Sequence, residues 1–267
     1  MTPTRHKQRR PFVFKQFTIY HDRCAMPLST DSVLLGAWVD VNNDQHLLDV
    51  GSGSGIVSLM IAQRNPNCTI EAVEIDYESH QQGLDNIRRS PWADRIYTFH
   101  LSFQEFVQQT LIKYDHIVSN PPFYQQDLQS PHPHRTIAKH AHLLSFSELI
   151  EGAAAILSDK GKLSVIIPFA EKDYFIRECL KRELFCIRYT SVRSTTQSPF
   201  IRSLVTFGKE PQPIEEDSLT LYENNPQEPT EAYRQLTYPF YLKMPHYIPN
   251  QYENKAKIDT GYLDKAE

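Results

Sequence analysis

Apolar and polar positions alternate along this chain in a way that predicts strands interleaved with helices. Short apolar runs at 47–50, 69–74, 95–101, 113–119, 162–167, 184–192 and 200–207 are typical of buried strands. Helical spacing of apolar positions fills 56–63, 145–157 and 171–183. Residues 194–199 read as a turn, and since no helix separates the strands around it, these two strands are most easily paired antiparallel. We therefore predict an α/β fold with a seven-stranded, mostly parallel sheet whose last strand is antiparallel.

Local signals mark where two of these helices begin or end. Ser145 and Glu148 have the spacing of a capping box, ahead of a helix that we expect to end near Gly161. Asn65 and Pro66 close the helix that starts at Ile56. These signals support helices between the strands, as expected for a doubly wound sheet.

A glycine loop follows the first of these strands. Residues 51–55 read Gly-Ser-Gly-Ser-Gly and lead into an apolar helix, which is typical of the first strand-to-helix turn of a doubly wound sheet. The third glycine comes one position earlier than in the usual dinucleotide pattern, and Asp49 precedes Gly51 by two residues. A carboxylate there repels a pyrophosphate but favours a ligand that carries ammonium and sulfonium charges. Asp49, Gly51, Gly53 and Gly55 are therefore predicted to bind S-adenosylmethionine rather than NAD.

An acidic residue ends the second strand at the spacing that a nucleoside site requires. Glu74 lies about 20 positions beyond the glycine loop, where a carboxylate accepts the ribose hydroxyls of a bound nucleotide. Asp76 is predicted to cap the helix that follows. We expect Glu74 to hold the ribose of the cofactor.

The segment 119–124 reads Ser-Asn-Pro-Pro-Phe-Tyr and directly follows a strand. A planar amine is a poor nucleophile because its lone pair is delocalised, so a catalyst must hold its two N–H bonds and aim the lone pair. The Asn120 side-chain carbonyl and the Pro121 backbone carbonyl offer two acceptors, and the fixed φ of Pro121 and Pro122 stiffens the turn. Phe123 offers a ring that can stack on a flat substrate. These four residues predict a catalytic motif for transfer to a planar nitrogen.

Composition and charge limit the class of protein. The chain has 267 residues, 40% of them hydrophobic, which is enough for one catalytic domain with extensions. No apolar run approaches the length of a membrane span, and the N-terminal residues are polar and basic, so we expect a cytoplasmic protein. The net charge is −4, but six cations gather near the N-terminus, and they can neutralise phosphates. They are Arg5, Lys7, Arg9, Arg10, Lys15 and Arg23.

No metal or disulfide framework is predicted. Cys24, Cys68, Cys179 and Cys186 are scattered and are expected to be small, mostly buried residues of a reducing compartment. The polar loop 125–142 contains four histidines together with Arg135 and Lys139. Because the two H-x-H pairs have no carboxylate beside them, we disfavour a metal site. The default expectation is a partly mobile polar loop, which can act as a substrate lid or phosphate contact.

The chain resembles one known family over nearly its whole length, and two segments carry the most specific likeness. Residues 14–38, Phe-Lys-Gln-Phe-Thr-Ile-Tyr-His-Asp-Arg-Cys-Ala-Met-Pro-Leu-Ser-Thr-Asp-Ser-Val-Leu-Leu-Gly-Ala-Trp, resemble the N-terminal signature of bacterial tRNA adenine-N6 methyltransferases that act on valine tRNA beside the anticodon. Residues 238–243, Tyr-Pro-Phe-Tyr-Leu-Lys, resemble the end of the same proteins. The glycine loop and Asn-Pro-Pro-Phe are shared with many Rossmann-like class I methyltransferases and specify only that class.

The resemblance implies a role for each part of the chain. Residues 120–123 are implied to form the catalytic motif, and Thr30 and Asp31 to lie beside the methionyl end of the cofactor. Where many relatives carry an Asp for the cofactor adenine, this chain reads Ser102-Phe103, so the resemblance implies that Ser102 or a backbone group makes this contact instead. The expected organisation is a basic N-terminal arm and cofactor-capping segment (1–35), a methyltransferase domain (36–208) and a C-terminal extension (209–267). A tRNA is the expected partner, and no stable protein partner is implied.

Three alternatives remain open from sequence. Enzymes that methylate a protein glutamine amide use a similar motif, because an amide and an adenine amine share planar geometry, but their motif usually ends in Tyr. A DNA adenine methyltransferase would need a target-recognition domain, which we do not see. An inactive RNA-binding module is the third, and the intact motif at 120–123 argues against it.

Overall fold

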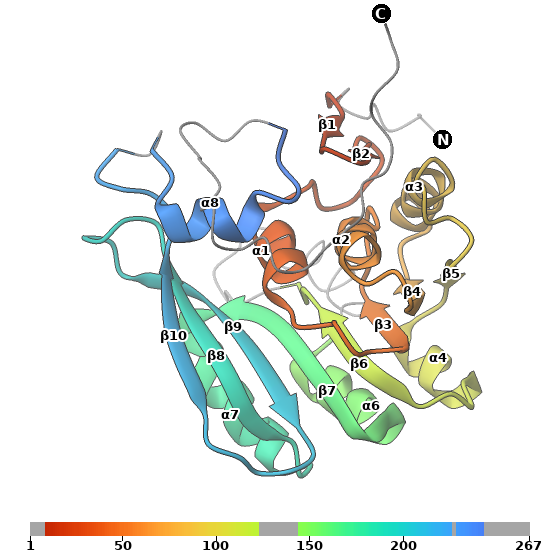
Figure 1. Ribbon diagram of the computed structural model, residues 1–267. Coiled ribbons are helices and arrows are strands. Elements are labelled where there is room, and N and C mark those ends of the chain that lie inside the picture. The colour runs from red at the N-terminus through yellow and green to blue at the C-terminus, as the bar shows by residue number, and fades with distance from the viewer. Residues whose placement is uncertain (1–8, 123–143, 226–227, 243–267) are drawn as a thin grey trace, which may run out of the picture.

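The protein is described here by a computed structural model that covers residues 9–122, 144–225 and 228–242. Its centre is a sheet with strand order β10-β8-β9-β7-β6-β3-β4-β5 (Figure 1). The strands are β3 (His46–Val50), β4 (Thr69–Glu74), β5 (Ile96–His100), β6 (Tyr114–Ser119), β7 (Leu157–Pro168), β8 (Phe185–Arg193), β9 (Phe200–Gly208) and β10 (Glu215–Thr220). All sheet pairings are parallel except those of β9 with β7 and β8.

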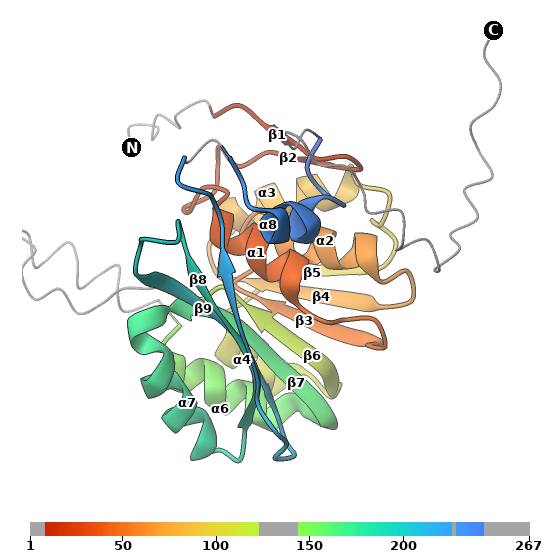
Figure 2. The same ribbon diagram turned by 60° about the vertical axis from the view of Figure 1, so that its left-hand side comes forward.

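Helices cover both faces of the sheet, and each face has its own apolar core (Figures 1 and 2). One face carries α1 (Thr30–Trp38), α2 (Ile56–Arg64), α3 (Tyr77–Arg88) and α8 (Glu231–Thr237). The other carries α4 (Phe103–Gln109), α6 (Phe146–Ile156) and α7 (Lys172–Leu180). Strands β3 and β6 are almost wholly buried, as expected for central strands covered by helices on both faces.

The predicted α/β fold is confirmed, with two corrections. The described part of the sheet has eight strands rather than seven, because β10, assigned to the C-terminal extension, pairs in parallel with β8. β10 was missed because four of its six residues are exposed, so it lacks an apolar pattern. The helix expected to end near Gly161 ends at Ile156, and Gly161 lies inside β7. A Cβ at Gly161 would stand 2.7 Å from the Tyr114 carbonyl oxygen, so β7 needs glycine there.

Segments from the two ends of the described chain lie side by side. β1 (Phe12–Val13) pairs antiparallel with β2 (Thr18–Ile19), and Phe14 forms a bridge with Tyr241. The rings of Phe14 and Phe17 stack at 4.7 Å, and those of Phe14 and Tyr241 at 5.8 Å. The segments predicted as a separate N-terminal arm and C-terminal extension therefore pack together, over α1 and α2.

Two further expectations concern burial and membranes. Cys24, Cys68 and Cys179 are buried, as predicted, and Cys186 is half-buried. Within the described residues, no helix combines the length and apolarity that crossing a bilayer requires.

Candidate active site

The sequence motifs converge at the carboxyl edge of the sheet, where ligands of doubly wound folds bind. The glycine loop follows β3, Glu74 ends β4, and Asn120 follows β6. Val50 and Ser119 are paired residues of neighbouring strands, and the Ser119 hydroxyl donates to the Val50 carbonyl at 2.9 Å. Asn120 and Gly51 therefore leave the sheet side by side.

The glycine loop has a backbone that other residues adopt with strain. Gly51, Gly53 and Gly55 have φ values of 72°, 53° and 77°. Space in front of Gly51 and Gly53 is open, since a Cβ on either would meet no atom within 4 Å. Gly55 is the N-cap of α2 and has no side chain to occupy the helix N-terminus. The loop thus offers a ligand bare backbone beside a helix N-terminus, which fits a nucleoside cofactor.

Glu74 ties this loop to the neighbouring strand. Its carboxylate accepts 2.8 Å hydrogen bonds from the Gly53 and Asp76 N–H groups, through one oxygen each. Burial raises the pKa of Glu74, and the two backbone bonds oppose that rise. Since each carboxylate oxygen can accept a second hydrogen bond, the side chain remains able to hold ribose hydroxyls.

Asp49 is buried behind the loop. Only 2% of its surface is exposed, and its Oδ2 accepts from the Ser58 N–H at 3.1 Å and the Ser58 hydroxyl at 2.6 Å. Burial raises the pKa of Asp49 to about 6, and the charge of Glu74 adds to the rise, whereas the bonds from Ser58 lower it. The carboxylate therefore fastens the end of β3 to the first turn of α2, so its contribution to the site includes holding the loop in shape.

Two residues of α3 that sequence reasoning missed support the loop from behind. A Cβ at Gly83 would lie 2.7 Å from the Gly53 carbonyl oxygen, so only glycine lets α3 approach this closely. Asn86 is 1% exposed, and its amide donates to the carbonyls of Ser54 and Tyr20 at 2.9 and 2.8 Å. Asn86 also accepts from the Tyr20 N–H, so one side chain joins the glycine loop to the N-terminal segment. A single glycine or asparagine in a polar helix pattern gave no signal of this role.

The first turn of α1 meets Asn120. The Asn120 amide nitrogen donates to the Ser32 hydroxyl at 2.9 Å. Asn120 is partly exposed, and its amide points to this helix rather than into the protein interior. Because the nitrogen is held by Ser32, the amide orientation is fixed and Oδ1 remains as an acceptor. Ser32 lies inside the quoted N-terminal signature but was not predicted as a site residue.

The other predicted residues of α1 lie beside that contact. Thr30 is exposed at the start of the helix, and Asp31 forms an ion pair with Arg202 of β9 at 2.8 Å. This ion pair joins α1 to β9. Asp31 thus has a structural partner, whatever further contact it makes with a ligand.

The remaining predicted site residues are placed less directly. Pro121 is buried and Pro122 partly exposed, while Phe123 and the loop 125–142 lie outside the described residues. Ser102 caps α4, and its hydroxyl donates to Glu105 at 2.7 Å. Ile75, which was not predicted as a site residue, follows Glu74 directly and is 45% exposed, so it offers an apolar surface beside the Glu74 carboxylate. Within the described residues, no group of three His, Cys, Asp or Glu side chains could hold a metal.

Several cations of the basic N-terminal arm have partners inside the protein. Arg9 donates to the His21 carbonyl at 3.1 Å, Lys15 donates to the Tyr238 carbonyl at 2.5 Å, and Arg23 pairs with Asp85. Arg5 and Lys7 lie outside the described residues. These three side chains serve intramolecular contacts and so are weaker candidates for phosphate binding than the sequence suggested.

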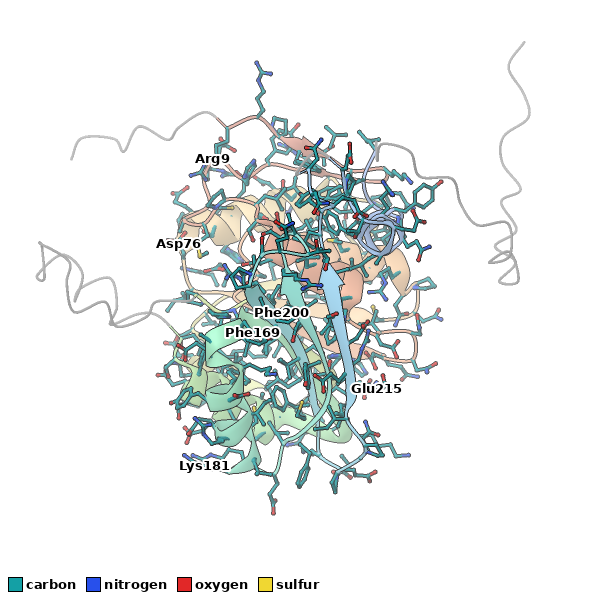
Figure 3. The ribbon with its side chains drawn as sticks, turned by 90° about the vertical axis from the view of Figure 1, so that its left-hand side faces the viewer. Arg9, Asp76, Phe169, Lys181, Phe200 and Glu215 are labelled. Carbon is teal, nitrogen blue, oxygen red and sulfur yellow. The ribbon has the colours of Figure 1, made fainter. Side chains whose placement is uncertain are left out.

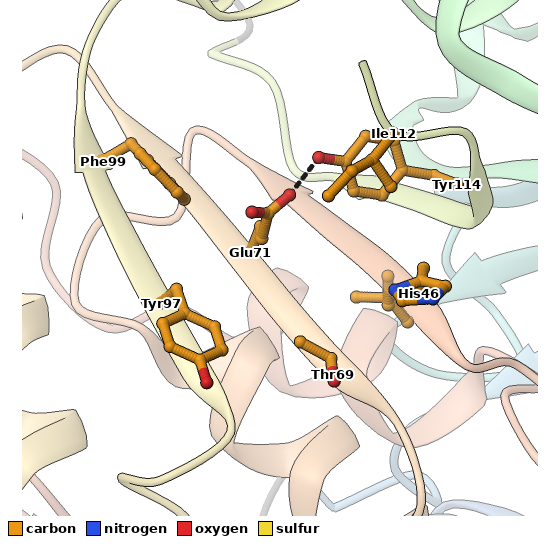
Figure 4. A pocket seen from close by; sticks show the side chains of 8 residues that line it. His46, Thr69, Glu71, Tyr97, Phe99, Ile112 and Tyr114 are labelled. Carbon is orange, nitrogen blue, oxygen red and sulfur yellow. Dashed lines mark hydrogen bonds between the residues drawn. The ribbon is translucent and has the colours of Figure 1, made fainter. Parts of the chain in front are cut away.

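A cavity of about 280 Å³ lies elsewhere, at the amino edge of the same strands (Figure 4). It is lined by His46, Thr69, Tyr97 and Ile112 among others, and Tyr114 donates to Glu71 on its wall. None of the predicted site residues lines it. We place the active site at the carboxyl edge because the loop, acid and Asn-Pro-Pro motif meet there.

A buried chain of hydrogen-bonded polar side chains has the residue types of a hydrolase triad, but it is not accessible to a substrate. His116 contacts Asp44 at 2.7 Å and the Ser164 hydroxyl at 2.8 Å. His116 is 1% exposed and Ser164 0%, and Ser164 also contacts the Thr206 hydroxyl. Because a nucleophile must reach its substrate, this chain is a structural network that joins four segments of the core.

Comparison with known proteins agrees with this geometry. Residues 25–184 match the methyltransferase small domain family. The chain is 42% identical over 234 residues to a tRNA1(Val) (adenine(37)-N6)-methyltransferase from Flavobacterium psychrophilum, which covers 87% of this chain and 100% of the relative. A protein of the same name from Haemophilus influenzae is 40% identical over 87% of this chain and 98% of its own length. The chain belongs to the tRNA1(Val) (adenine(37)-N6)-methyltransferase family. The family resemblance inferred from residues 14–38 and 238–243 is thereby confirmed.

Solved structures support the fold of this methyltransferase family member. A predicted O-methyltransferase from Agrobacterium tumefaciens superposes with a TM-score of 0.63 at 19% identity, covering 79% of this chain and 96% of that one. A methyltransferase from Pyrococcus furiosus gives a TM-score of 0.52 at 18% identity, over 72% and 88% of the two chains. At such low identity these matches establish the class I methyltransferase fold alone.

Proposed function

We propose that this protein transfers a methyl group from S-adenosylmethionine to N6 of adenine 37, next to the anticodon, in a valine tRNA. The observation that carries the proposal is the Asn120 amide, held by Ser32 at 2.9 Å beside the glycine loop. Two of the relatives described above carry this activity in their names. A tRNA substrate also implies a cytoplasmic setting.

The described residues suit S-adenosylmethionine. Gly51, Gly53 and Gly55 expose backbone to the ligand, and Glu74 offers its carboxylate to the ribose. Asp49 adds a negative potential near the methionyl part while it fastens the loop. The bound cofactor supplies an electrophilic methyl carbon on a sulfonium.

Asn120 and Pro121 prepare the nucleophile. Asn120 Oδ1 and the Pro121 carbonyl accept the two hydrogens of the adenine amine, which leaves its nitrogen lone pair free to point at the methyl carbon. The proposed contribution of Phe123 is to stack on the base. As the nitrogen–methyl bond forms, the bond from the methyl carbon to the sulfonium breaks and S-adenosylhomocysteine is left. The nitrogen then gives its extra proton to solvent. The transfer is direct, so no covalent bond to the protein forms. Because N6 is out of reach in a stack, the base must be splayed from its loop, which is easier than extruding it from a duplex.

Substrate class is the point that an experiment must decide. The protein is incubated with methyl-labelled S-adenosylmethionine and, separately, unmodified valine tRNA, duplex DNA and a protein extract. We expect label in tRNA, recovered as N6-methyladenosine after digestion, and none in a tRNA whose target adenine is replaced by guanine. Label confined to protein would instead support glutamine methylation. RNA binding without label in any substrate would support the inactive RNA module.

A further inference from the structure

Two aromatic rings form a lip beside the candidate active site. Phe169 begins the short 3-10 helix η1 (Phe169–Glu171) after β7, and Phe200 begins β9. Their ring centroids are 5.2 Å apart with planes inclined by 34°, and both side chains are partly exposed. Figure 3 labels Phe169 and Phe200 next to each other. Rings that pack on each other yet remain exposed leave apolar edges and faces for a ligand.

The register of the strands fixes where this lip stands relative to Asn120. Ser119 pairs with Val165 in the parallel ladder, so Asn120 is level with Ile166. Pro168, the last residue of β7, is two residues beyond Ile166, roughly 7 Å further along the sheet at 3.3 Å per strand residue, and Phe169 follows it directly. Pro168 pairs with Arg202, so Phe200 projects past the same edge from the neighbouring strand. The lip therefore rises next to the proposed entrance for the target base.

Cations lie against both rings. The Arg193 guanidinium is 5.4 Å from the Phe200 centroid, and Lys172 Nζ lies 4.1 Å from the Tyr189 centroid and 5.2 Å from the Phe169 centroid. Arg193 donates to the Thr220 hydroxyl and the Thr196 carbonyl, which are neutral acceptors that hold its side chain without cancelling its charge. The nearby Asp31 carboxylate is paired with Arg202. Aromatic faces interleaved with cations are the combination that single-stranded nucleic acids require, because each nucleotide brings a flat base and a phosphate.

We propose that this aromatic lip (Phe169, Lys172, Arg193 and Phe200) binds the unpaired RNA that flanks the target adenine. Phe169 and Phe200 stack on the neighbouring base, and Lys172 and Arg193 neutralise adjacent phosphates. The proposal rests on the tRNA substrate proposed above and deepens it, since it assigns the contact that keeps a splayed loop in place. A glutamine side chain of a protein substrate has neither a phosphate nor a ring for this surface.

The first test measures RNA affinity of lip variants with S-adenosylhomocysteine present. Phe200→Ala and Phe169→Ala are expected to raise the Kd for a labelled valine anticodon stem-loop roughly 5- to 150-fold, the range for loss of one stacked base. Phe200→Trp should restore most of the affinity. Tyr97→Ala is the matched control, since Tyr97 is 51% exposed but lies at the opposite edge of the sheet. Wild-type Kd values for both lip variants would overturn the proposal.

The second test identifies the contacted base and separates a binding role from loss of fold. An abasic nucleotide is placed on either side of the target adenine, and its penalty is combined with Phe200→Ala. If the Phe200 ring stacks on that base, removing both should weaken RNA binding little more than removing either one alone. Fully additive losses of binding free energy at both positions would overturn the stacking contact. The thermal unfolding temperature of the Phe200→Ala protein and its Kd for S-adenosylhomocysteine should stay near the wild-type values, which shows that the variant is folded.

The cations are tested through salt. Arg193→Gln should reduce the slope of log Kd against log salt by about 0.7, the value for one phosphate on a single strand. An unchanged slope would remove Arg193 from the interface. Failure of the proposed function gives a different result from failure of the lip proposal. If the proposed function is wrong, the wild-type protein neither binds the stem-loop nor methylates the tRNA. If only the lip proposal is wrong, the lip variants still bind the stem-loop and methylate the tRNA.

Discussion

Replacing Ser32 by Ala tests whether the orientation of the Asn120 amide matters. In the structure, the Asn120 nitrogen donates to the Ser32 hydroxyl at 2.9 Å, so the amide oxygen is the group left to accept from a substrate amine. Without the hydroxyl, the two flipped orientations of the amide become similar in energy. The flipped amide presents its own N–H groups to the amine and cannot hold it.

The size of the effect follows from one hydrogen bond. A bond of this kind contributes about 0.5 to 1.5 kcal/mol net. If that difference is expressed in the transition state, Ser32→Ala lowers kcat by about 2- to 12-fold, at tenfold per 1.36 kcal/mol. Cofactor affinity should change little, because Ser32 touches Asn120 rather than the glycine loop.

Single-turnover methylation of valine tRNA with saturating S-adenosylmethionine is the appropriate assay. Ser32→Thr retains the hydroxyl and should recover most of the rate. Ser145→Ala is the matched control, since Ser145 caps α6 through the Glu148 N–H and its loss should cost about 1 kcal/mol of stability without changing the contacts of the Ser32 hydroxyl. A Ser32→Ala enzyme with wild-type kcat and unchanged stability would refute the reasoning.

Three further variants test other parts of the site. Asn120→Ala should abolish turnover but leave the Kd for S-adenosylmethionine nearly intact by calorimetry, and turnover at the original rate would remove Asn120 from the mechanism. Asp49→Asn should stabilise the protein at pH 8. Burial raises the pKa of Asp49 from its ordinary value of 3.8 to about 6, so the wild-type protein loses stability as the pH rises through 6 and the carboxyl ionises, whereas the Asn variant does not. The gain is at most about 3 kcal/mol and should vanish in unfolding measurements near pH 4, while cofactor affinity falls; equal stability of the two proteins at pH 8 would contradict the burial argument. Gly83→Ala should weaken cofactor binding at least tenfold and cost about 1 to 3 kcal/mol in denaturant unfolding, since its Cβ would stand 2.7 Å from the Gly53 carbonyl oxygen, and a wild-type Kd would mean that α3 does not set the loop's shape.

Patterns that are local in sequence were enough for most of the fold. The apolar runs at β3, β4 and β6 to β9 predicted strands because those segments are buried, and Asp76 was correctly predicted to cap α3. Strand β10 failed the same reasoning, since a mostly exposed edge strand has no apolar period to detect. Its place beside β8 is decided by backbone pairing, which does not require an apolar pattern.

The site divides in the same way. Some candidate site residues could be predicted from sequence, because the backbone conformation of a cofactor loop and the chemistry of a planar amine restrict which residue types suit those positions. These are Gly51, Gly53, Gly55, Glu74 and Asn120. Ser32, Gly83 and Asn86 could not be predicted, because each acts through a neighbour that is at least 30 residues away along the chain, such as Asn120, 88 residues from Ser32. The sequence by itself determined which chemistry the protein carries. Only the tertiary structure decided which groups hold that chemistry in position, since a side chain's partner is set by packing between elements and leaves no periodic trace in the sequence.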